Sequence, residues 1–324
     1  MRVAFLNLCH TDPDIVARAT QRLTMHPDFD MYIHIDAKSE IDPFLAVLGE
    51  CERTNIIDIR HKVYWGGFNA VKATIDLLRS ALSSQREYQY FVLLQNLDYP
   101  LQSNESIDRF FTSQQGTEFI RACNIARTKD WRFSTKYRIY NKRDDDFYLM
   151  NHSKVRLYFR YMHMLLRSIP KLLWNGIIKE DDEAFQIHYG AAQWAVTRAC
   201  AEFLVAFYDT HPTFNAHMAH IQFPDEEYFH TAVHNSPFKY KCILYDEPER
   251  RWLVNWRNLH YFEYPREITV LTEKDFDKLT AQEGVLFIRK VRTGISEGLM
   301  NLIDAQYENK PERYDPLPPE RTPR

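Results

Sequence analysis

The alternation of short apolar runs with amphipathic segments in the N-terminal third most constrains how this chain can fold. Buried strands are predicted at Val3–Leu8, Met31–Ile35, Ile56–Ile59 and Tyr90–Leu94. Between them, Asp14–Leu23 and Asn69–Leu82 carry apolar residues at helical spacing, and Pro13 suits the start of the first helix. This order predicts an α/β fold, a Rossmann-type mostly parallel sheet flanked by helices, with ligands at the carboxyl ends of the strands.

The pattern changes over residues 125–185, where basic and aromatic residues are interleaved. Within this segment, 154–179 mixes Arg and Lys with large apolar residues. We favour an insertion helix that packs its apolar face on the core; the alternative is a basic amphipathic surface that meets an anionic membrane or an acceptor. Further helices are expected near Arg198–Tyr208 and after Pro224, and the Pro-, Glu- and Arg-rich tail 309–324 is predicted to be disordered.

Composition excludes several classes of function. With 41 basic and 44 acidic residues the net charge is −3, which is unlike a nucleic-acid-binding protein. Only 9 glycines are present, and neither glycine-rich phosphate-binding motif occurs. The five cysteines are dispersed, so no disulfide framework or zinc ribbon is expected. No signal peptide or membrane-spanning run is found, and a cytoplasmic location is expected.

Two acidic motifs could hold a divalent cation, but neither fits well. Asn96-Leu97-Asp98 follows a predicted strand yet supplies one carboxylate, whereas a bridging cation usually needs at least two oxygen ligands. Asp98 is therefore expected to bind ligand hydroxyl groups. Asp144-Asp145-Asp146 follows a basic stretch instead of a strand, so a solvated charge run is the favoured interpretation. We predict no metal site.

The segment Phe223–Thr231 is the richest local signal. Asp225, Glu226 and Glu227 follow Pro224, and acidic residues stabilise the first turn of a helix through its dipole. The functional alternative places one carboxylate at the rim of a cleft as a general base. Composition alone favours the structural interpretation.

Short motifs along residues 1–295 resemble, in order, the Branch family of inverting glycosyltransferases, which includes core-2/I-branching N-acetylglucosaminyltransferases and peptide O-xylosyltransferases. Each motif is weak alone, but their shared order makes the resemblance specific. The motifs are Ala4–His10, His34–Ser39, Trp65–Ala73, Leu94–Leu101, Gly190–Trp194, Pro224–Glu226 with Thr231, Arg251 with Trp256, and Leu286–Lys290.

The resemblance implies a GT-A-like catalytic domain over residues 1–308, with 125–185 as a variable insertion on the acceptor side. It implies that Glu226 is the catalytic base, and Thr231 sets the motif's register in favour of Glu226 over Glu227. Arg251 and Lys290 match the basic pair that replaces a metal by neutralising the nucleotide diphosphate.

Other positions are carried over with less specific roles. His34 and Asp36 match the nucleotide end of the donor site. Trp65 could stack on a sugar ring or fill the core. The positions expected near the sugar or the acceptor are Asp98, Trp194, Asp225 and Trp65.

The implied reaction is metal-independent transfer from a UDP-sugar to a hydroxyl of a glycan or glycoconjugate, which forms a β linkage. UDP-GlcNAc is the expected donor and UDP-xylose the second choice, and no cofactor is expected. A non-catalytic nucleotide- or carbohydrate-binding module and a metal-dependent glycosyltransferase remain alternatives. Expected partners are the donor, the acceptor and, through residues 154–179, a peripheral membrane contact, but no nucleic acid.

Overall fold

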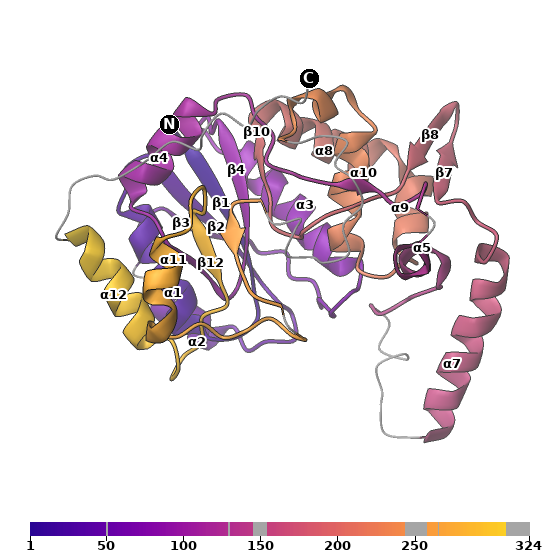
Figure 1. The fold of residues 1–324 in the computed structure, drawn as a ribbon, viewed down its shortest axis with the longest axis horizontal. Helices are drawn as coiled ribbons and strands as arrows, with labels where there is room; N and C mark the ends of the chain where they lie inside the picture. The colour runs from indigo at the N-terminus through magenta and orange to yellow at the C-terminus, as the bar shows by residue number, and fades with distance from the viewer. Residues whose placement is uncertain (50, 129, 145–153, 244–257, 265, 309–324) are drawn as a thin grey trace.

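A five-stranded sheet forms the centre of the computed structural model, which describes residues 1–49, 51–128, 130–144, 154–243, 258–264 and 266–308. The strand order is β10-β4-β1-β2-β3. Strands β1 to β4 run parallel, and only the edge strand β10 is antiparallel. Their bounds are β1 Val3–Cys9, β2 Phe29–Ile35, β3 Thr54–Ile56, β4 Tyr90–Gln95 and β10 Ala195–Thr197. The mostly parallel sheet confirms the predicted fold class (Figure 1).

Helices α1 (Pro13–Thr24) and α3 (Asn69–Leu82) cover the two faces of this sheet. Alternate side chains of a strand point to opposite faces. Accordingly, Phe5 of β1 shares a buried cluster with α1, whereas Leu6 shares one with α3. Because both faces are covered, β1 and β2 are apolar along most of their length and read as continuous runs.

The predicted bounds agree closely with the observed elements, apart from one strand. Helix α3 has the predicted bounds, Asn69–Leu82. Strand β3 spans Thr54–Ile56 instead of the predicted Ile56–Ile59. It is a short edge strand whose residues are only partly buried, so the apolar pattern did not locate it, and Ile59 is 55% exposed.

A second, smaller sheet of order β11-β12-β5 lies beside the first. With α1, α11 and α12 it forms a separate buried cluster that includes Tyr99 and Ile288. Its elements are β5 Asp98–Pro100, β11 His260–Tyr261, β12 Phe287–Arg289, η5 Glu273–Asp275, α11 Phe276–Thr280 and α12 Glu297–Glu308. This sheet brings the C-terminal part of the chain against the end of β4.

The remaining elements surround the two sheets. Residues 198–241 supply a mostly helical layer next to β10, and a hairpin over residues 177–186 packs against this layer. The elements are α2 Asp42–Leu48, α4 Asn104–Ser113, β6 Cys123–Asn124, α5 Trp131–Arg138, α7 Lys154–Ser168, η1 Ile169–Lys171, β7 Ile177–Glu180, β8 Glu183–Gln186, β9 His188–Tyr189, α8 Arg198–Thr210, α9 Pro212–Met218, η2 Pro224–Glu226, α10 Tyr228–His234 and η3 Pro237–Lys241.

Segment 125–185 departs from the favoured prediction. It contains α5, α7 and the β7–β8 hairpin, and α7 extends away from the body of the molecule (Figure 1). Apolar residues of α7 such as Leu165 and Leu166 are each 59% exposed. The expectation of an insertion helix packing its apolar face on the core is therefore wrong for α7, because these side chains have no core to pack against.

Three further predictions concern the cysteines, membrane-spanning segments and the C-terminal tail. All five cysteines, each within the described part, are buried and free. Within the described ranges, no helix combines the length and apolarity that crossing a bilayer requires. The predicted disordered tail, 309–324, lies outside the described residues.

Candidate active site

A cavity of about 410 Å³ opens at the carboxyl ends of β1, β2 and β4. The residues that follow these strands supply one wall, and the loops before α3 and α10 supply the opposite walls. Of the predicted site residues, His34, Asp36, Trp65, Asp225 and Glu226 line this cavity. Segments far apart in sequence therefore meet where the fold predicts a ligand site.

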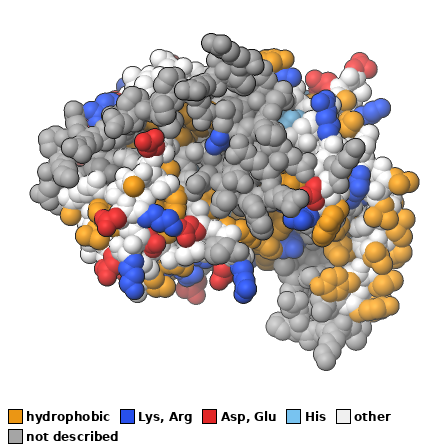
Figure 2. Space-filling model, viewed as in Figure 1, with side chains coloured by type: hydrophobic (Ala, Val, Ile, Leu, Met, Phe, Trp, Pro, Cys, Tyr) orange, Lys and Arg blue, Asp and Glu red, His pale blue; other side chains and the backbone are white. Residues whose placement is uncertain are grey.

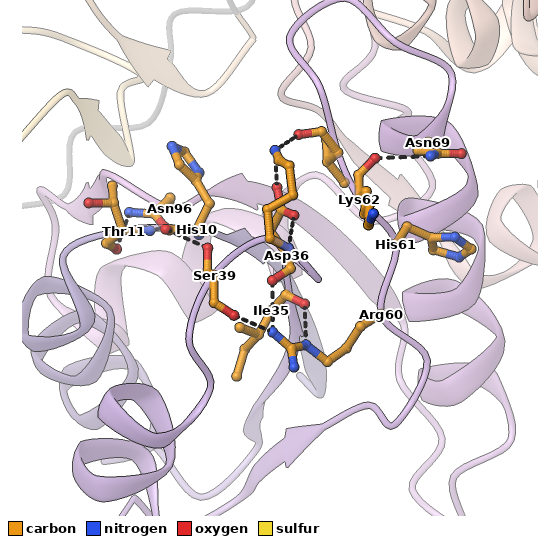
Figure 3. Close-up of polar contacts among 12 residues, drawn as sticks. His10, Thr11, Ile35, Asp36, Ser39, Arg60, His61, Lys62, Asn69 and Asn96 are labelled. Atoms are coloured by element: carbon orange, nitrogen blue, oxygen red, sulfur yellow. Dashed lines mark hydrogen bonds and ion pairs between the residues drawn. The ribbon is translucent and has the colours of Figure 1, made fainter. Parts of the chain in front are cut away.

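Hydrogen bonds fix the strand ends that form the floor of the cavity (Figure 3). The Oδ1 atom of Asn96 accepts from the backbone N–H groups of His10 and Thr11 at 2.5 and 2.9 Å. Its Nδ2 atom donates to the Thr11 carbonyl at 2.8 Å. Asn96 of the Asn96-Leu97-Asp98 motif thus ties the end of β4 to the end of β1.

Asp36 and the residues after it form the wall beyond β2. The Asp36 carboxylate accepts from the backbone N–H and the Nζ of Lys38, both at 2.8 Å. The Arg60 guanidinium donates to the carbonyls of Ile35, Asp36 and Ser39 (Figure 3). These contacts tie the loop to the end of β2, where Asp36 and Lys38 line the cavity.

His34 is a neutral side chain at this wall. Burial, together with the nearby His61, lowers the pKa of His34 to about 4. Its Nε2 atom accepts from the backbone N–H of His61 at 2.9 Å, which leaves the ring proton on Nδ1. No described residue accepts that proton. The ring of His34 is thus a buried, neutral part of this wall, held by its bond to the loop that carries His61.

Trp65 lies at the mouth of the cavity and is 74% exposed. Its ring meets Phe223 edge-on at 4.6 Å, and the Arg143 guanidinium lies 5.0 Å from its centre. Arg143 also donates to the Trp65 carbonyl at 3.0 Å. The alternative in which Trp65 fills the core is therefore wrong, and its ring is available to a ligand.

The acidic motif divides its three carboxylates between the cavity and the interior. Asp225 and Glu226, both in the 3₁₀ turn η2, line the cavity, whereas Glu227 is fully buried. Burial and the neighbouring Glu226 raise the pKa of Asp225. Burial raises that of Glu227 well above its usual range. Glu226 rather than Glu227 is thus the glutamate at the cavity, as the register of the motif implied.

Lys136 of α5 contacts Glu226 directly. Its Nζ lies 3.2 Å from Glu226 Oε2, and both side chains are largely shielded, at 17% and 18% exposed. The same ammonium group lies 4.1 Å from the centre of the Tyr189 ring and 5.0 Å from that of Phe223. This pair was missed in the sequence, because segment 125–185 matches none of the motifs.

Gly190 and Thr231 position the acidic turn from behind. The Gly190 N–H donates to the Glu226 carbonyl at 2.9 Å. Thr231 Oγ1 accepts from the His188 N–H at 3.0 Å, which fastens α10 to β9. Two motifs separated in the chain therefore form one unit that carries the carboxylates.

Asp98 is not a ligand-facing residue, contrary to prediction. It is buried behind the cavity, where its carboxylate meets Arg289 Nη1 at 2.8 Å and His260 Nε2 at 3.3 Å. Burial alone would raise the pKa of Asp98, but the charges of Arg289 and His260 hold this pKa below its usual value. Asp98 therefore orients Arg289, which does line the cavity.

Trp194 was expected near the sugar or the acceptor, but its side chain does not line the cavity. It is 1% exposed, and its ring lies 5.2 Å from that of Phe229 in the core. Its neighbour Gln193 lines the cavity instead and approaches Gln95 at 3.3 Å. Trp194 thus packs in the core behind the wall, against Phe229 of α10.

The predicted cationic pair is not assembled within the described part of the chain. Arg251 lies outside the described residues. Lys290 is partly buried and is not among the described residues that line the cavity, whereas the adjacent Arg289 is. The roles of Arg251 and Lys290 at the diphosphate stay predictions, and Arg289 is a described cation that does line the cavity.

The acidic triplet has a structural role at its described residue. Asp144 accepts from the backbone N–H of Asn69 at 2.8 Å and so caps the start of α3, which is more than a solvated charge. Asp145 and Asp146 lie outside the described residues. Among described residues, no three His, Cys, Asp or Glu side chains converge as metal ligands would. Metal independence stays a prediction.

This fold and cavity define the class of α/β proteins that bind ligands at the carboxyl ends of a mostly parallel sheet. The family model described as Core-2/I-Branching enzyme matches residues 3–280. The chain therefore belongs to the Core-2/I-Branching enzyme family. The match contains His34, Trp65, Asp225 and Glu226, whereas Lys290 lies beyond it.

Among curated proteins, the chain is similar to xylosyltransferases. A xylosyltransferase of Ciona intestinalis is 20% identical over 94% of this chain and 34% of its own length. Xylosyltransferase 1 of Homo sapiens is 20% identical over 73% of this chain and 22% of its own. Xylosyltransferase 2 of Rattus norvegicus is 19% identical over 73% of this chain and 25% of its own length. The chain thus spans about a third or less of these relatives.

Proposed function

We propose that this protein transfers a sugar from a UDP-sugar to a hydroxyl group of a glycan or glycoconjugate, with inversion and without a metal. The observation that carries the proposal is the placement of Glu226. It lines the cavity at the strand ends, and in the resemblance its position is that of the catalytic base. Its shielded ion pair with Lys136 supports this role, because a base must be held within reach of the proton it removes.

In the proposed reaction, Glu226 removes the proton of the acceptor hydroxyl while that oxygen attacks the anomeric carbon of the donor. The bond from this carbon to the diphosphate breaks, and its electron pair leaves with UDP. Arg289 faces the cavity, where its positive charge can stabilise the developing charge of the diphosphate. Lys290 and Arg251 are retained from the resemblance as further partners of the diphosphate. Trp65 offers an exposed ring for the sugar or acceptor.

The donor is one of two UDP-sugars. The resemblance includes N-acetylglucosaminyltransferases, whereas the curated relatives are named xylosyltransferases. We propose UDP-GlcNAc or UDP-xylose, and the acceptor is left at the level of a glycan or glycoconjugate. Loops that choose acceptors differ most among relatives, so similarity at this level does not identify it.

The decisive experiment measures UDP release from a panel of UDP-sugars with acceptor glycans, with and without EDTA. We expect turnover with UDP-GlcNAc or UDP-xylose that is unaffected by the chelator. Activity that is lost with EDTA and restored by Mn²⁺ would contradict the metal-free mechanism. UDP binding without turnover of any donor would favour the non-catalytic binding module.

Glu226→Gln tests the base directly. The substitution keeps the size of the side chain but removes its ability to accept a proton, so we expect kcat to fall by about 100- to 10,000-fold. UDP affinity, measured by calorimetry, should change little. The matched control is Glu52→Gln, since Glu52 is 83% exposed and does not line the cavity. Near-normal turnover in Glu226→Gln would falsify the assignment.

A further inference from the structure

A continuous set of large apolar side chains is exposed on α7 and the turn after it. We call this set the apolar strip. It comprises Tyr158, Phe159, Tyr161, Leu165, Leu166, Ile169, Leu172 and Leu173, which are 50% to 96% exposed. Scattered apolar residues are normal on a protein surface, but a contiguous group of this size marks an interaction site.

The strip lies on one side of α7, and two other residues of the helix, His163 and Ser168, contact Tyr140 of the preceding segment. Tyr158, Tyr161 and Leu165 are spaced at three and four residues, which aligns them along the helix. Ser168 is buried and its Oγ accepts from the Tyr140 N–H at 2.9 Å. His163 meets the Tyr140 ring at 5.7 Å. The helix is thus held with its apolar side outward.

The space-filling view agrees with this arrangement. Orange side chains gather over the region of α7, at the extremity of the molecule that extends from the body in the ribbon view (Figures 1 and 2). A projecting helix can reach a flat surface without a clash from the remainder of the protein. A groove-shaped partner is not required.

The charge of this segment identifies the partner. Residues 154–179 contain no acidic residue, although the whole chain carries a net charge of −3. The basic residues of the segment are Lys154, Arg156, Arg160, Arg167, Lys171 and Lys179. Arg167 is exposed, whereas Lys171 is engaged, since its Nζ donates to the His220 carbonyl at 3.0 Å. A local excess of positive charge beside apolar side chains is complementary to anionic lipid headgroups.

We propose that the apolar strip binds the surface of an anionic lipid bilayer, with α7 lying in the interface. Aromatic and leucine side chains would enter the boundary between headgroups and acyl chains, and the exposed Arg167 would contact the headgroups. Self-association through the strip is less favourable, because it would bring two basic segments together. The proposal does not depend on the catalytic mechanism.

The test is co-sedimentation of the purified full chain with vesicles of phosphatidylglycerol mixed with phosphatidylcholine, and with vesicles of phosphatidylcholine alone. We expect binding to the mixed vesicles that is at least tenfold tighter than to the neutral ones at low salt, and weaker at high salt. Equal binding to both, or none to either, would overturn the proposal.

Variants assign the binding to the strip. Leu165→Ser combined with Leu166→Ser should weaken binding to mixed vesicles by at least tenfold, since two apolar contacts are lost. The matched control is Leu45→Ser combined with Leu302→Ser, both 43% exposed elsewhere, which should bind as the wild type does. Arg167→Gln should weaken binding about fivefold at low salt, whereas Arg132→Gln on α5 should not.

Two further outcomes complete the test. Circular dichroism and UDP release in solution should be unchanged in the Leu165/Leu166 variant, which shows that it is folded. If gel filtration showed that this variant turns an oligomer into a monomer while vesicle binding persists, the strip would be a contact between copies of this chain, and the lipid proposal would be wrong.

Discussion

At the scale of single residues, charge at the cavity is arranged by buried side chains that do not face it. Asp98 is enclosed by the protein and holds Arg289 toward the cavity at 2.8 Å. Lys136 stands in the same relation to Glu226, at 3.2 Å. Such pairs gain strength in a shielded setting and restrict the side chain that acts on the ligand. Specific carboxylates and cations are thereby kept in place before any donor binds.

Lys136 is therefore predicted to be a positioning residue. Lys136→Met removes the cation beside Glu226 and frees that carboxylate to move, so kcat should fall by about 10- to 100-fold with little change in the KM for the donor. Lys136→Arg should restore part of the rate because it keeps the charge. Steady-state kinetics, with the donor and acceptor concentrations both varied, separate the effect on kcat from the effect on KM.

Arg132→Met is the matched control, since Arg132 lies on the same helix and its side chain is 52% exposed. It should retain wild-type kinetics. An unchanged kcat in Lys136→Met, or a loss confined to KM, would show that the ion pair does not serve the transfer step.

At the scale of elements, the acidic turn depends on a close approach between β9 and the chain before α10. Gly190 donates its N–H to the Glu226 carbonyl, and a Cβ at this position would lie 2.2 Å from the Arg121 carbonyl oxygen. It would also lie 2.5 Å from Nε2 of the buried His230. Backbone on one side and a packed ring on the other leave no room for a side chain, so glycine is required here.

Gly190→Ala is expected to displace the turn that carries Glu226. The overpacking should lower the free energy of unfolding by about 1 to 3 kcal/mol, measured by urea denaturation, and should reduce transfer more than UDP binding. Gly49→Ala is the control, because Gly49 has a helical φ of −61° and should tolerate a methyl group better. A stable, fully active Gly190→Ala protein would contradict the close approach.

At the scale of the whole molecule, several histidines are buried in the neutral form. Burial, with the nearby His234, lowers the pKa of His188 to about 3, and burial with His61 lowers that of His34 to about 4. In the unfolded chain both return to about 6.5. Below pH 6.5 the unfolded chain therefore binds protons that the folded protein does not. The free energy of unfolding decreases as the pH falls below 6.5 for this reason.

His188→Asn tests this at a residue away from the cavity. Asn retains an N–H for the Gln186 carbonyl, which His188 Nδ1 meets at 2.7 Å, but it does not titrate. Between pH 7 and pH 5 the wild type should lose about 2 kcal/mol more of its unfolding free energy than the variant does. Urea denaturation at pH 7 and pH 5 measures the two unfolding free energies. If wild type and variant lost the same amount, His188 would not be the source of the pH dependence.

The sequence by itself determined the elements and the general place of the site. Periodicity located α3 at its observed bounds, and the run of strands predicted a parallel sheet whose carboxyl ends hold the cavity. These features follow from local patterning, because burial on one side of a helix or on both sides of a strand leaves a regular spacing of apolar residues. The family motifs then selected Glu226 from three adjacent carboxylates.

Tertiary structure alone decided which side chains face the cavity. Trp194 and Asp98 carry the motif positions yet lie behind the wall. Arg289 lines the cavity and Lys136 contacts Glu226, although the motifs singled out neither residue. The same periodicity describes a helix whose apolar side is covered and one, such as α7, whose apolar side is exposed. Spacing along the chain reports which residues share a face, but contacts between distant segments determine what that face meets.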